Sequence, residues 1–134
     1  DPADVLRTFV RQVETPTLRD IALGVQAEIY DYLTGTGCDI PVLDARLTLA
    51  DPQSVLSALC RRLGLDFDPA MLSWRKGGIP EDGIWAPYWY HAVHASKGFG
   101  PYREKHEPVP SRLLGVLEEA LPHYRRLLEL AISA

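Results

Sequence analysis

The chain of 134 residues has little cysteine, no long apolar run and no excess of basic residues. Its two cysteines allow one bridge at most, which excludes a framework built on disulfides. No apolar stretch approaches the roughly 18 residues of a membrane-spanning helix, and no secretory signal is visible. The formal net charge of −4 argues against a general nucleic-acid binder, which needs a basic face. We therefore expect neither a membrane nor a nucleic acid as partner.

Metal chemistry and redox chemistry have little support as well. Cys38 and Cys60 belong to no CxxC pair and show no zinc-type spacing. We expect two reduced thiols in a cytoplasmic protein. His91 and His94 would fall on adjacent turns of a helix, a geometry that can bind metal. No third ligand stands at motif spacing, so no metal is expected.

The length and the composition, with 46% hydrophobic and 24% charged residues, are typical of one globular domain or a piece of one. Asp1 and Pro2 give the signal of a helix start, an N-cap followed by proline. Apolar residues at helical spacing then predict a helix over about 2–14. A helix capped by the first residue predicts that a strand, and more, precedes it. A processed or engineered N-terminus gives the same pattern, and this alternative stays open.

Three further segments follow the first helix. Thr17 and Asp20 form a T-x-x-D capping pattern that predicts a second helix ending at the glycines of 35–37. Its predicted buried stripe comprises Leu18, Ile21, Val25, Ile29 and Tyr32. The apolar run 40–43 predicts a buried strand of a parallel sheet. Asp51 and Pro52 repeat the cap signal and predict a helix that Gly64 ends.

The remaining chain is an aromatic loop region and a helical tail. A short helical turn is expected at 66–73, and a short helix at about 87–95 within a region rich in glycine, proline and aromatic residues. The tail 111–133 is predicted as a helix that Pro122 kinks or splits. Its predicted stripe comprises Leu114, Leu117, Leu121, Tyr124 and Leu128. The organisation is then a helical hairpin (1–39), a strand plus helix (40–64), an aromatic loop region (65–110) and a C-terminal helix (111–134).

The order of these signals resembles a known family. The runs 51–65, 67–74, 82–90 and 120–127 are similar to sulfotransferases that use 3′-phosphoadenosine 5′-phosphosulfate. They resemble the bacterial and plant branch, whose plant members are sometimes fused to aminotransferase-like domains. The resemblance implies an α/β fold of the P-loop-containing nucleoside triphosphate hydrolase type, about twice as long as this chain. This chain would be its C-terminal half, mostly α-helical with one or two short strands.

The resemblance also implies a site for the nucleotide, although no Gly-x-x-x-x-Gly-Lys-Ser/Thr loop exists in the chain. Thr8 falls where the family has a serine that grips the 3′-phosphate, and a threonine hydroxyl can donate to the same oxygen. The family loop that closes over this phosphate has two candidates here, between which the sequence does not choose. One is Arg75, Lys76 and Gly77. The other is Ser96, Lys97 and Gly98.

The implied function is part of a sulfuryl transfer from 3′-phosphoadenosine 5′-phosphosulfate, as co-substrate, to a hydroxyl or amine of an unidentified small molecule. The expected acceptor pocket consists of Trp85, Tyr88 and Trp89. No catalytic residue is assigned, and this chain alone is expected to be inactive. Its expected partner is the N-terminal half or a second copy. The alternative is a non-catalytic helical binding module derived from the same fold.

Overall fold

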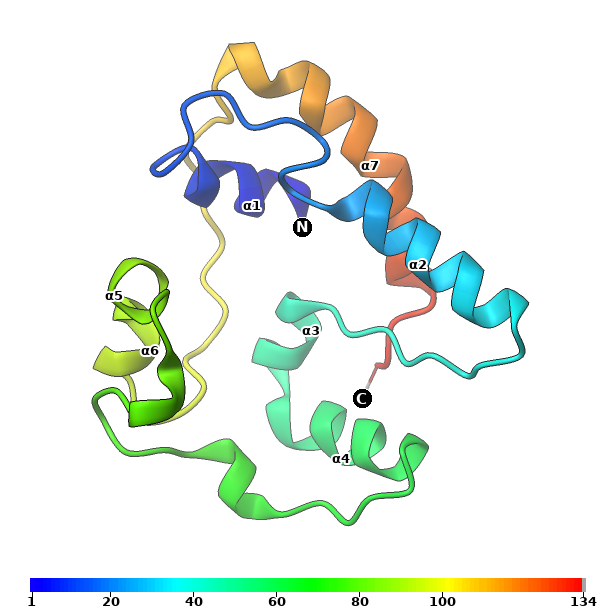
Figure 1. Cartoon of the computed structure of the whole chain (residues 1–134), viewed down its shortest axis with the longest axis vertical. Helices are drawn as coiled ribbons and strands as arrows, with labels where there is room; N and C mark the ends of the chain where they lie inside the picture. Colours follow the sequence, from blue (N-terminus) through cyan, green and yellow to red (C-terminus); the bar gives the residue numbers. More distant parts are fainter. Residues whose placement is uncertain (134) are drawn as a thin grey trace. The chain divides into compact units, whose positions relative to one another are not determined.

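The computed structural model describes residues 1–133, which form two units (Figure 1). The first unit comprises residues 1–46 and 103–133, and the second comprises 47–102. Within the described residues, strand pairing is limited to two isolated bridges, Val42 with Ala131 and Ser73 with Gly98. The prediction of a mostly helical chain is confirmed, whereas the expected short strands are reduced to single bridges.

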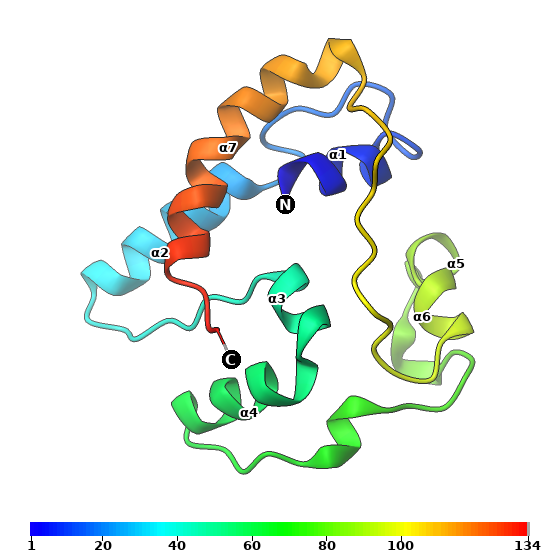
Figure 2. The same cartoon turned by 180° about the vertical axis from the view of Figure 1, so that it is seen from behind.

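Three helices build the first unit. Helix α7 (Leu114–Glu129) packs against α1 (Pro2–Phe9) and α2 (Leu23–Gly35), and α2 and α7 lie side by side in both views (Figures 1 and 2). A short 3₁₀ turn, η3 (Ser111–Leu113), leads into α7. Their apolar faces meet in one core, because helices of this length gain most of their stability from packing. The buried residues of that core are Leu6, Ile21, Leu113 and Ala120.

Helix α1 begins as predicted but ends early. The carboxylate of Asp1 accepts hydrogen bonds from the amides of Ala3 and Asp4, as an N-cap does. The helix predicted for 2–14 stops at Phe9, and residues 10–13 continue as hydrogen-bonded turns. The guanidinium of Arg112 binds the carbonyl of Glu14 at 3.1 Å. This contact joins segments far apart in the sequence, so a local pattern does not encode it.

The capping pair ahead of α2 forms, but it closes a single turn. The amide of Thr17 donates to the Asp20 carboxylate at 2.8 Å, and the Thr17 hydroxyl donates to the same oxygen at 2.7 Å. Ala22 then adopts a left-handed backbone, with φ of 58°, which interrupts a helix. The predicted start of the second helix was therefore wrong, and α2 begins at Leu23.

The interruption at Ala22 also changes which side of α2 is buried. Ile21 is buried as predicted, and within α2 it is Ala27 that is buried. The predicted stripe is wrong beyond Ile21, since Val25, Ile29 and Tyr32 are exposed by 40%, 52% and 72%. Because a left-handed residue changes the direction of the chain, apolar residues before and after Ala22 do not lie on one continuous helix face.

The apolar run 40–43 is extended but is not a buried strand. Val42 forms a parallel bridge with Ala131, and its carbonyl accepts from the amide of Ile132 at 2.9 Å. Leu43 is 43% exposed. The parallel direction agrees with the prediction, whereas burial does not, because within the described residues no other strand lies beside this segment.

In the second unit, α4 (Pro52–Arg62) follows the prediction closely. The Asp51 carboxylate caps it by accepting from the amide of Ser54 at 3.0 Å, and Val55 is buried. Gly64 ends it with φ of 69°, the left-handed conformation that glycine adopts without strain. A short helix, α3 (Ala45–Ala50), precedes α4 where the two units join along the chain.

The aromatic region contains short helical pieces. The turn expected at 66–73 is a 3₁₀ helix, η1 (Pro69–Leu72), and a second, η2 (Pro80–Asp82), follows. The helix expected at about 87–95 is divided at Tyr90 into α5 (Ala86–Trp89) and α6 (His91–Ala95).

Helix α7 runs through Pro122 without a break, so a split at that proline was wrong. Its buried residues are Ala120 and Leu127, preceded by Leu113 in η3. The predicted stripe is partly buried at Leu117, Leu121, Tyr124 and Leu128, and only Leu114 at its start is exposed, by 46%. The helix turns its small Ala120 toward α1 and α2, because a small residue lets helices approach closely.

Both cysteines are free thiols; Cys38 is exposed and Cys60 is buried. Across residues 1–133, no helix combines the length and apolar character that crossing a bilayer demands.

Candidate functional site

The two loops that the sequence offered as alternatives lie side by side in the second unit. Ser73 and Gly98 form an antiparallel bridge. The amide of Trp74 donates to the carbonyl of Lys97 at 3.1 Å. We call residues 73–78 and 94–99 the paired loops. They form one element, so they need not be rival sites.

Trp74 holds the paired loops together through its side chain. Its indole N–H donates to the Ser96 hydroxyl at 2.9 Å, and its ring meets that of Phe99 edge to face, with centroids 5.3 Å apart. The Ser96 hydroxyl donates in turn to the carbonyl of Val93 at 2.7 Å. Because a serine hydroxyl has one hydrogen, that proton is already engaged within the protein. Ser96 therefore has a structural role that the sequence did not reveal.

The glycines of the paired loops serve different purposes. A Cβ atom at Gly98 would lie 2.8 Å from the carbonyl oxygen of Leu72, so glycine is needed for the approach of the two chains. Gly77 has φ of 106° and open space where a Cβ would be. It is needed for a left-handed turn, and it leaves the backbone of this turn accessible.

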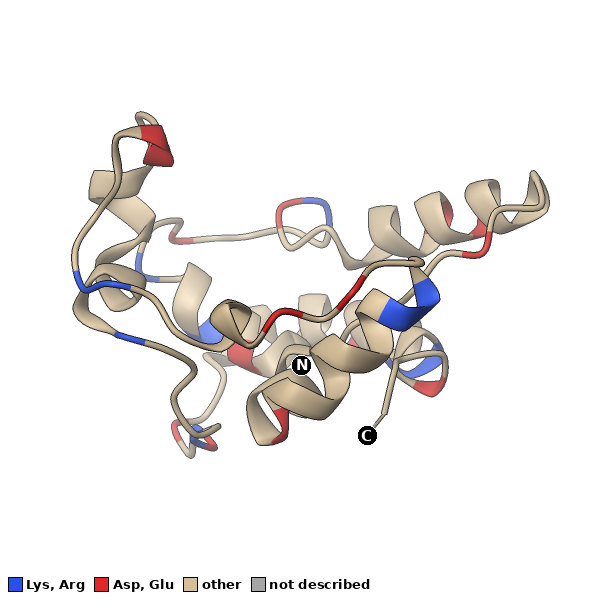
Figure 3. Ribbon diagram, turned by 90° about the horizontal axis from the view of Figure 1, so that it is seen from below, with Lys and Arg blue, Asp and Glu red and all other residues tan. Residues whose placement is uncertain are grey.

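Three cations project from the paired loops. Arg75, Lys76 and Lys97 are exposed, and along residues 1–133 none of them forms an ion pair with a carboxylate. Figure 3 shows how the basic and acidic residues are interspersed along the ribbon. Arginine supplies a planar fork of donors and lysine a point charge, and both bind phosphate or sulfate oxygens. These three side chains are free to bind such an anion.

A histidine–aspartate pair beside the paired loops was missed by the sequence reasoning. His94 Nε2 lies 2.8 Å from the Asp82 carboxylate, which also accepts from the amide of Ile79 at 2.9 Å. The amide of Gly77 donates to the His94 carbonyl at 2.9 Å. Within the described residues no cluster of three metal-ligating side chains exists. His94 thus pairs with a carboxylate and fixes the turn that carries Lys76.

We expect the stability that Asp82 contributes to depend on pH in the acid range. The amide of Ile79, and then His94, lower the pKa of Asp82 below its ordinary value of about 3.9. The unfolded chain therefore takes up this proton first, so the contribution is complete above about pH 5 and is lost as the pH falls through the lowered pKa. Urea unfolding between pH 7 and 3, followed by tryptophan fluorescence, should show the wild type converging on Asp82→Asn as the pH falls.

His94→Gln is the matched control for this prediction, because it leaves the bond from the Ile79 amide intact. Its stability should fall with pH in the same direction as that of the wild type but by a smaller amount, because only the contribution of His94 is lost. A constant gap between the wild type and Asp82→Asn at every pH would contradict the assignment.

The expected acceptor residues are exposed. Trp85, Tyr88 and Trp89 lie in and beside α5 and are exposed by 64%, 64% and 45%. They do not form the core of the second unit, which is the commonest use of such aromatic clusters.

Thr8 lies in the first unit, on the exposed side of α1. Its hydroxyl donates to the carbonyl of Asp4 at 3.0 Å and accepts a hydrogen bond from Lys105 Nζ at 2.6 Å. Lys105 was not singled out from the sequence. No local signal links two residues so far apart in the chain, and only the fold places this cation at the hydroxyl.

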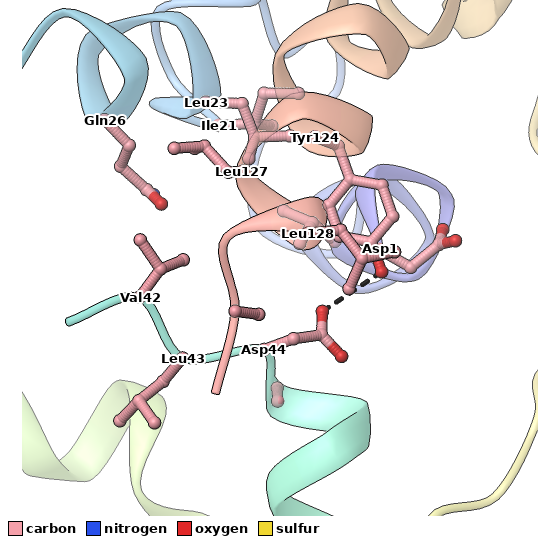
Figure 4. A pocket seen from close by; sticks show the side chains of 13 residues that line it. Asp1, Ile21, Leu23, Gln26, Val42, Leu43, Asp44, Tyr124, Leu127 and Leu128 are labelled. Carbon is pink, nitrogen blue, oxygen red and sulfur yellow. Dashed lines mark hydrogen bonds between the residues drawn. The ribbon is translucent and has the colours of Figure 1, made fainter. Parts of the chain in front are cut away.

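The first unit also contains an apolar pocket of about 170 Å³ (Figure 4). Among its polar lining residues, Asp44 is 7% exposed and accepts hydrogen bonds from the Tyr124 hydroxyl and the Arg46 amide, both at 3.0 Å. A pocket for a drug-sized ligand measures about 300–1,000 Å³, so this one is too small for a nucleotide. Val42 and Leu43 line it from the extended segment.

Comparison with known proteins identifies the family to which this chain belongs. The profile of the family described as "Sulfotransferase domain" matches residues 1–131. The chain is 37% identical over 127 residues to branched-chain-amino-acid aminotransferase-like protein 1 of Arabidopsis thaliana, and 34% identical over 127 residues to protein 2 of the same name and organism. These alignments cover 95% of this chain but 23% and 22% of the relatives. The chain therefore spans less than a quarter of their length. No solved structure matches it.

Proposed function

The chain belongs to the sulfotransferase domain family, and from this premise we propose that it is part of an enzyme that transfers a sulfuryl group. The donor is 3′-phosphoadenosine 5′-phosphosulfate, and the acceptor is a hydroxyl or amine of a small molecule. The acceptor atom bonds to sulfur and gives up its proton to solvent or a base, the bond from sulfur to the 5′-phosphate oxygen breaks, and 3′,5′-adenosine diphosphate leaves. Such a step depends mainly on positioning and on cationic donors around the charged oxygens.

One observation carries the assignment of a donor contact to the second unit. The paired loops present Arg75, Lys76 and Lys97 without carboxylate partners in the described chain, next to the open turn at Gly77. Exposed cations that lack internal partners lose little when they bind an oxyanion. These residues are the proposed phosphate contacts of the second unit.

The other residues predicted from the sequence divide into proposed ligand contacts and residues with a structural role. Thr8 is a proposed contact in the first unit, where its hydroxyl proton goes to the Asp4 carbonyl and Lys105 brings a cation to the same oxygen. Ser96 and Gly98 suit a structural role better, since the Ser96 proton is engaged and Gly98 permits the approach of Leu72. Trp85, Tyr88 and Trp89 are exposed and are the proposed acceptor surface.

We also propose that the segment 40–43 pairs with a strand from the rest of the domain. Leu43 is 43% exposed, and Val42 is paired through a single parallel bridge. The curated relatives are more than four times as long as the aligned region, which leaves ample chain for such a strand. An unpaired apolar strand edge is otherwise prone to aggregate.

Calorimetry with 3′,5′-adenosine diphosphate tests the proposed donor contacts. We expect the 134-residue chain to bind it, and the combined change Arg75→Gln, Lys76→Gln, Lys97→Gln to weaken binding by at least about tenfold. Raising the salt concentration should weaken the wild type more than this variant, because salt screens exposed charges.

Arg125→Gln is the matched control, since Arg125 is an exposed cation of α7 in the other unit. Its affinity should equal that of the wild type. No binding at millimolar nucleotide, together with dimerisation or protein binding, would favour the non-catalytic module instead.

A further inference from the structure

We propose that a groove in the first unit, between the end of α1 and residues 105–110, binds a tetrahedral oxyanion, a phosphate or sulfate group, through Lys105 and Arg11. The groove has a volume of about 200 Å³. It is lined by Arg7, Val10, Arg11, Lys105, Glu107, Pro108 and Pro110. This volume accommodates one such group but not a whole nucleotide. The oxyanion is the terminal group of a larger ligand or a free ion.

Lys105 is the central cation of the groove. The residue as a whole is partly buried, and its ammonium group donates to two neutral oxygens, the Thr8 hydroxyl at 2.6 Å and the Asp4 carbonyl at 3.3 Å. A lysine ammonium has three hydrogens, so one remains for a ligand. Among residues 1–133 no carboxylate lies within ion-pair distance of Lys105. A partly desolvated cation of this kind attracts an anion more strongly than an exposed one does.

Arg11 supplies a second charge. Its side chain is exposed at the turn that follows α1, and within the described chain it forms no ion pair. The guanidinium can therefore offer two parallel donors to an oxyanion. With Lys105 it provides two positive charges from two different segments that line the same groove.

Arg7 positions the groove rather than binding the ligand. Its Nε donates to the carbonyl of Glu107 at 2.6 Å, and its NH1 nitrogen forms an ion pair with the Asp4 carboxylate at 2.9 Å. These bonds tie residues 105–110 to α1. Pro108 and Pro110 restrict the backbone on the same segment, so the site is largely formed before a ligand arrives, which lowers the entropic cost of binding.

Two features of the groove disfavour anion binding. The carboxylate-bearing residue Glu107 lines it, and α1 ends there, so its negative dipole end is near. We therefore expect Glu107→Gln to tighten oxyanion binding by a few-fold. A groove meant for a cation would respond in the opposite direction.

The experiment measures amide chemical shifts and affinity with three probes: inorganic phosphate, 3′,5′-adenosine diphosphate and 5′-adenosine monophosphate. We expect phosphate to move the amide signals of residues 7–11 and 105–107 in the wild-type chain. Lys105→Gln combined with Arg11→Gln should weaken phosphate at least tenfold. Lys105→Arg, which keeps the charge, should largely retain binding, and Arg125→Gln is the matched control.

The nucleotide probes distinguish the two sources of the oxyanion. If it is the donor's 3′-phosphate, which rests on the proposed function, the double variant weakens 3′,5′-adenosine diphosphate but not 5′-adenosine monophosphate. If it is a free ion, only inorganic phosphate is affected. The inference is overturned if phosphate leaves these amides unmoved, or if Lys105→Gln and Arg11→Gln each leave its affinity unchanged.

Failure of this inference and failure of the proposed function give different results. Loss of nucleotide binding in the paired-loop variant, with no effect of Lys105→Gln or Arg11→Gln on the affinity for inorganic phosphate or for nucleotide, sustains the proposed function and refutes the groove. Phosphate binding at the groove without any nucleotide binding supports the groove and refutes the proposed function. Arg11→Gln alone serves if a Lys105 variant unfolds, because Arg11 is exposed and makes no ion pair in the described residues.

Discussion

Replacing Leu6 by alanine should destabilise the first unit by about 2–5 kcal/mol. Leu6 is fully buried, with 0% exposure, and is one of the largest side chains buried to this degree. It packs with Ile21, Leu113 and Ala120, which come from three other segments. Truncation removes apolar contacts from all of them and leaves a cavity that rigid helices fill only in part.

Val5→Ala is the control for this change, because Val5 lies on the same helix and is 37% exposed. It should change stability by less than about 1 kcal/mol. Hydrogen exchange of the amides of α1 and α7 reports on the first unit by itself, which a single melting curve of a two-unit chain does not. Equal exchange rates in Leu6→Ala and Val5→Ala would show that this core does not hold the unit together.

The starts of α1 and α4 could be predicted because the interactions that form them are local. Asp1 and Asp51 each cap a helix through amides two or three residues further on, and proline follows each of them at the first helical position. Such a signal needs nothing from the rest of the fold. The same reasoning explains why the end of α4 at Gly64 was predicted correctly.

Burial was predicted only in part, because it depends on partners far away in the sequence. In α2 the left-handed Ala22 changes the phase, so Ile29 and Tyr32 are exposed instead of buried. In α7 the buried residues are Ala120 and Leu127, whereas the predicted stripe is partly buried except for the exposed Leu114. Hydrophobic spacing alone does not decide which apolar residues of a helix become buried, because contacts from other segments select them.

In the candidate site, too, local motifs could be predicted and contacts between distant residues could not. Its exposed cations, Arg75, Lys76 and Lys97, were singled out from short motifs that carry their own chemistry. The pairing of the two loops, the bond from Lys105 to Thr8 and the pair of His94 with Asp82 were not predicted. Each of them joins residues separated by many positions, so each depends on how the backbone folds rather than on a motif.

Replacing Gly98 by alanine should have the second large effect, a loss of the pairing between the two loops. The added Cβ would lie 2.8 Å from the carbonyl oxygen of Leu72, a contact with backbone that a side-chain rotation cannot relieve. Relief requires the two chains to separate, which breaks the bridge to Ser73 and weakens the bond from Trp74 to Lys97. Overpacking of this kind costs about 1–3 kcal/mol. The Trp74 indole signal, which reports its bond to Ser96 and its contact with Phe99, should shift or broaden.

Gly100→Ala is the matched control, because a Cβ at Gly100 meets nothing within 4 Å and its φ is not in the left-handed region. Its effect on stability should be within about 0.5 kcal/mol, and the Trp74 signal should stay unchanged. The comparison separates two roles of Gly98. If Gly98→Ala keeps the paired loops intact by this signal yet weakens 3′,5′-adenosine diphosphate, the glycine serves the ligand directly. If the signal and the affinity change together, the glycine acts by holding Lys97 against Trp74, and the cations bind only because the loops are paired.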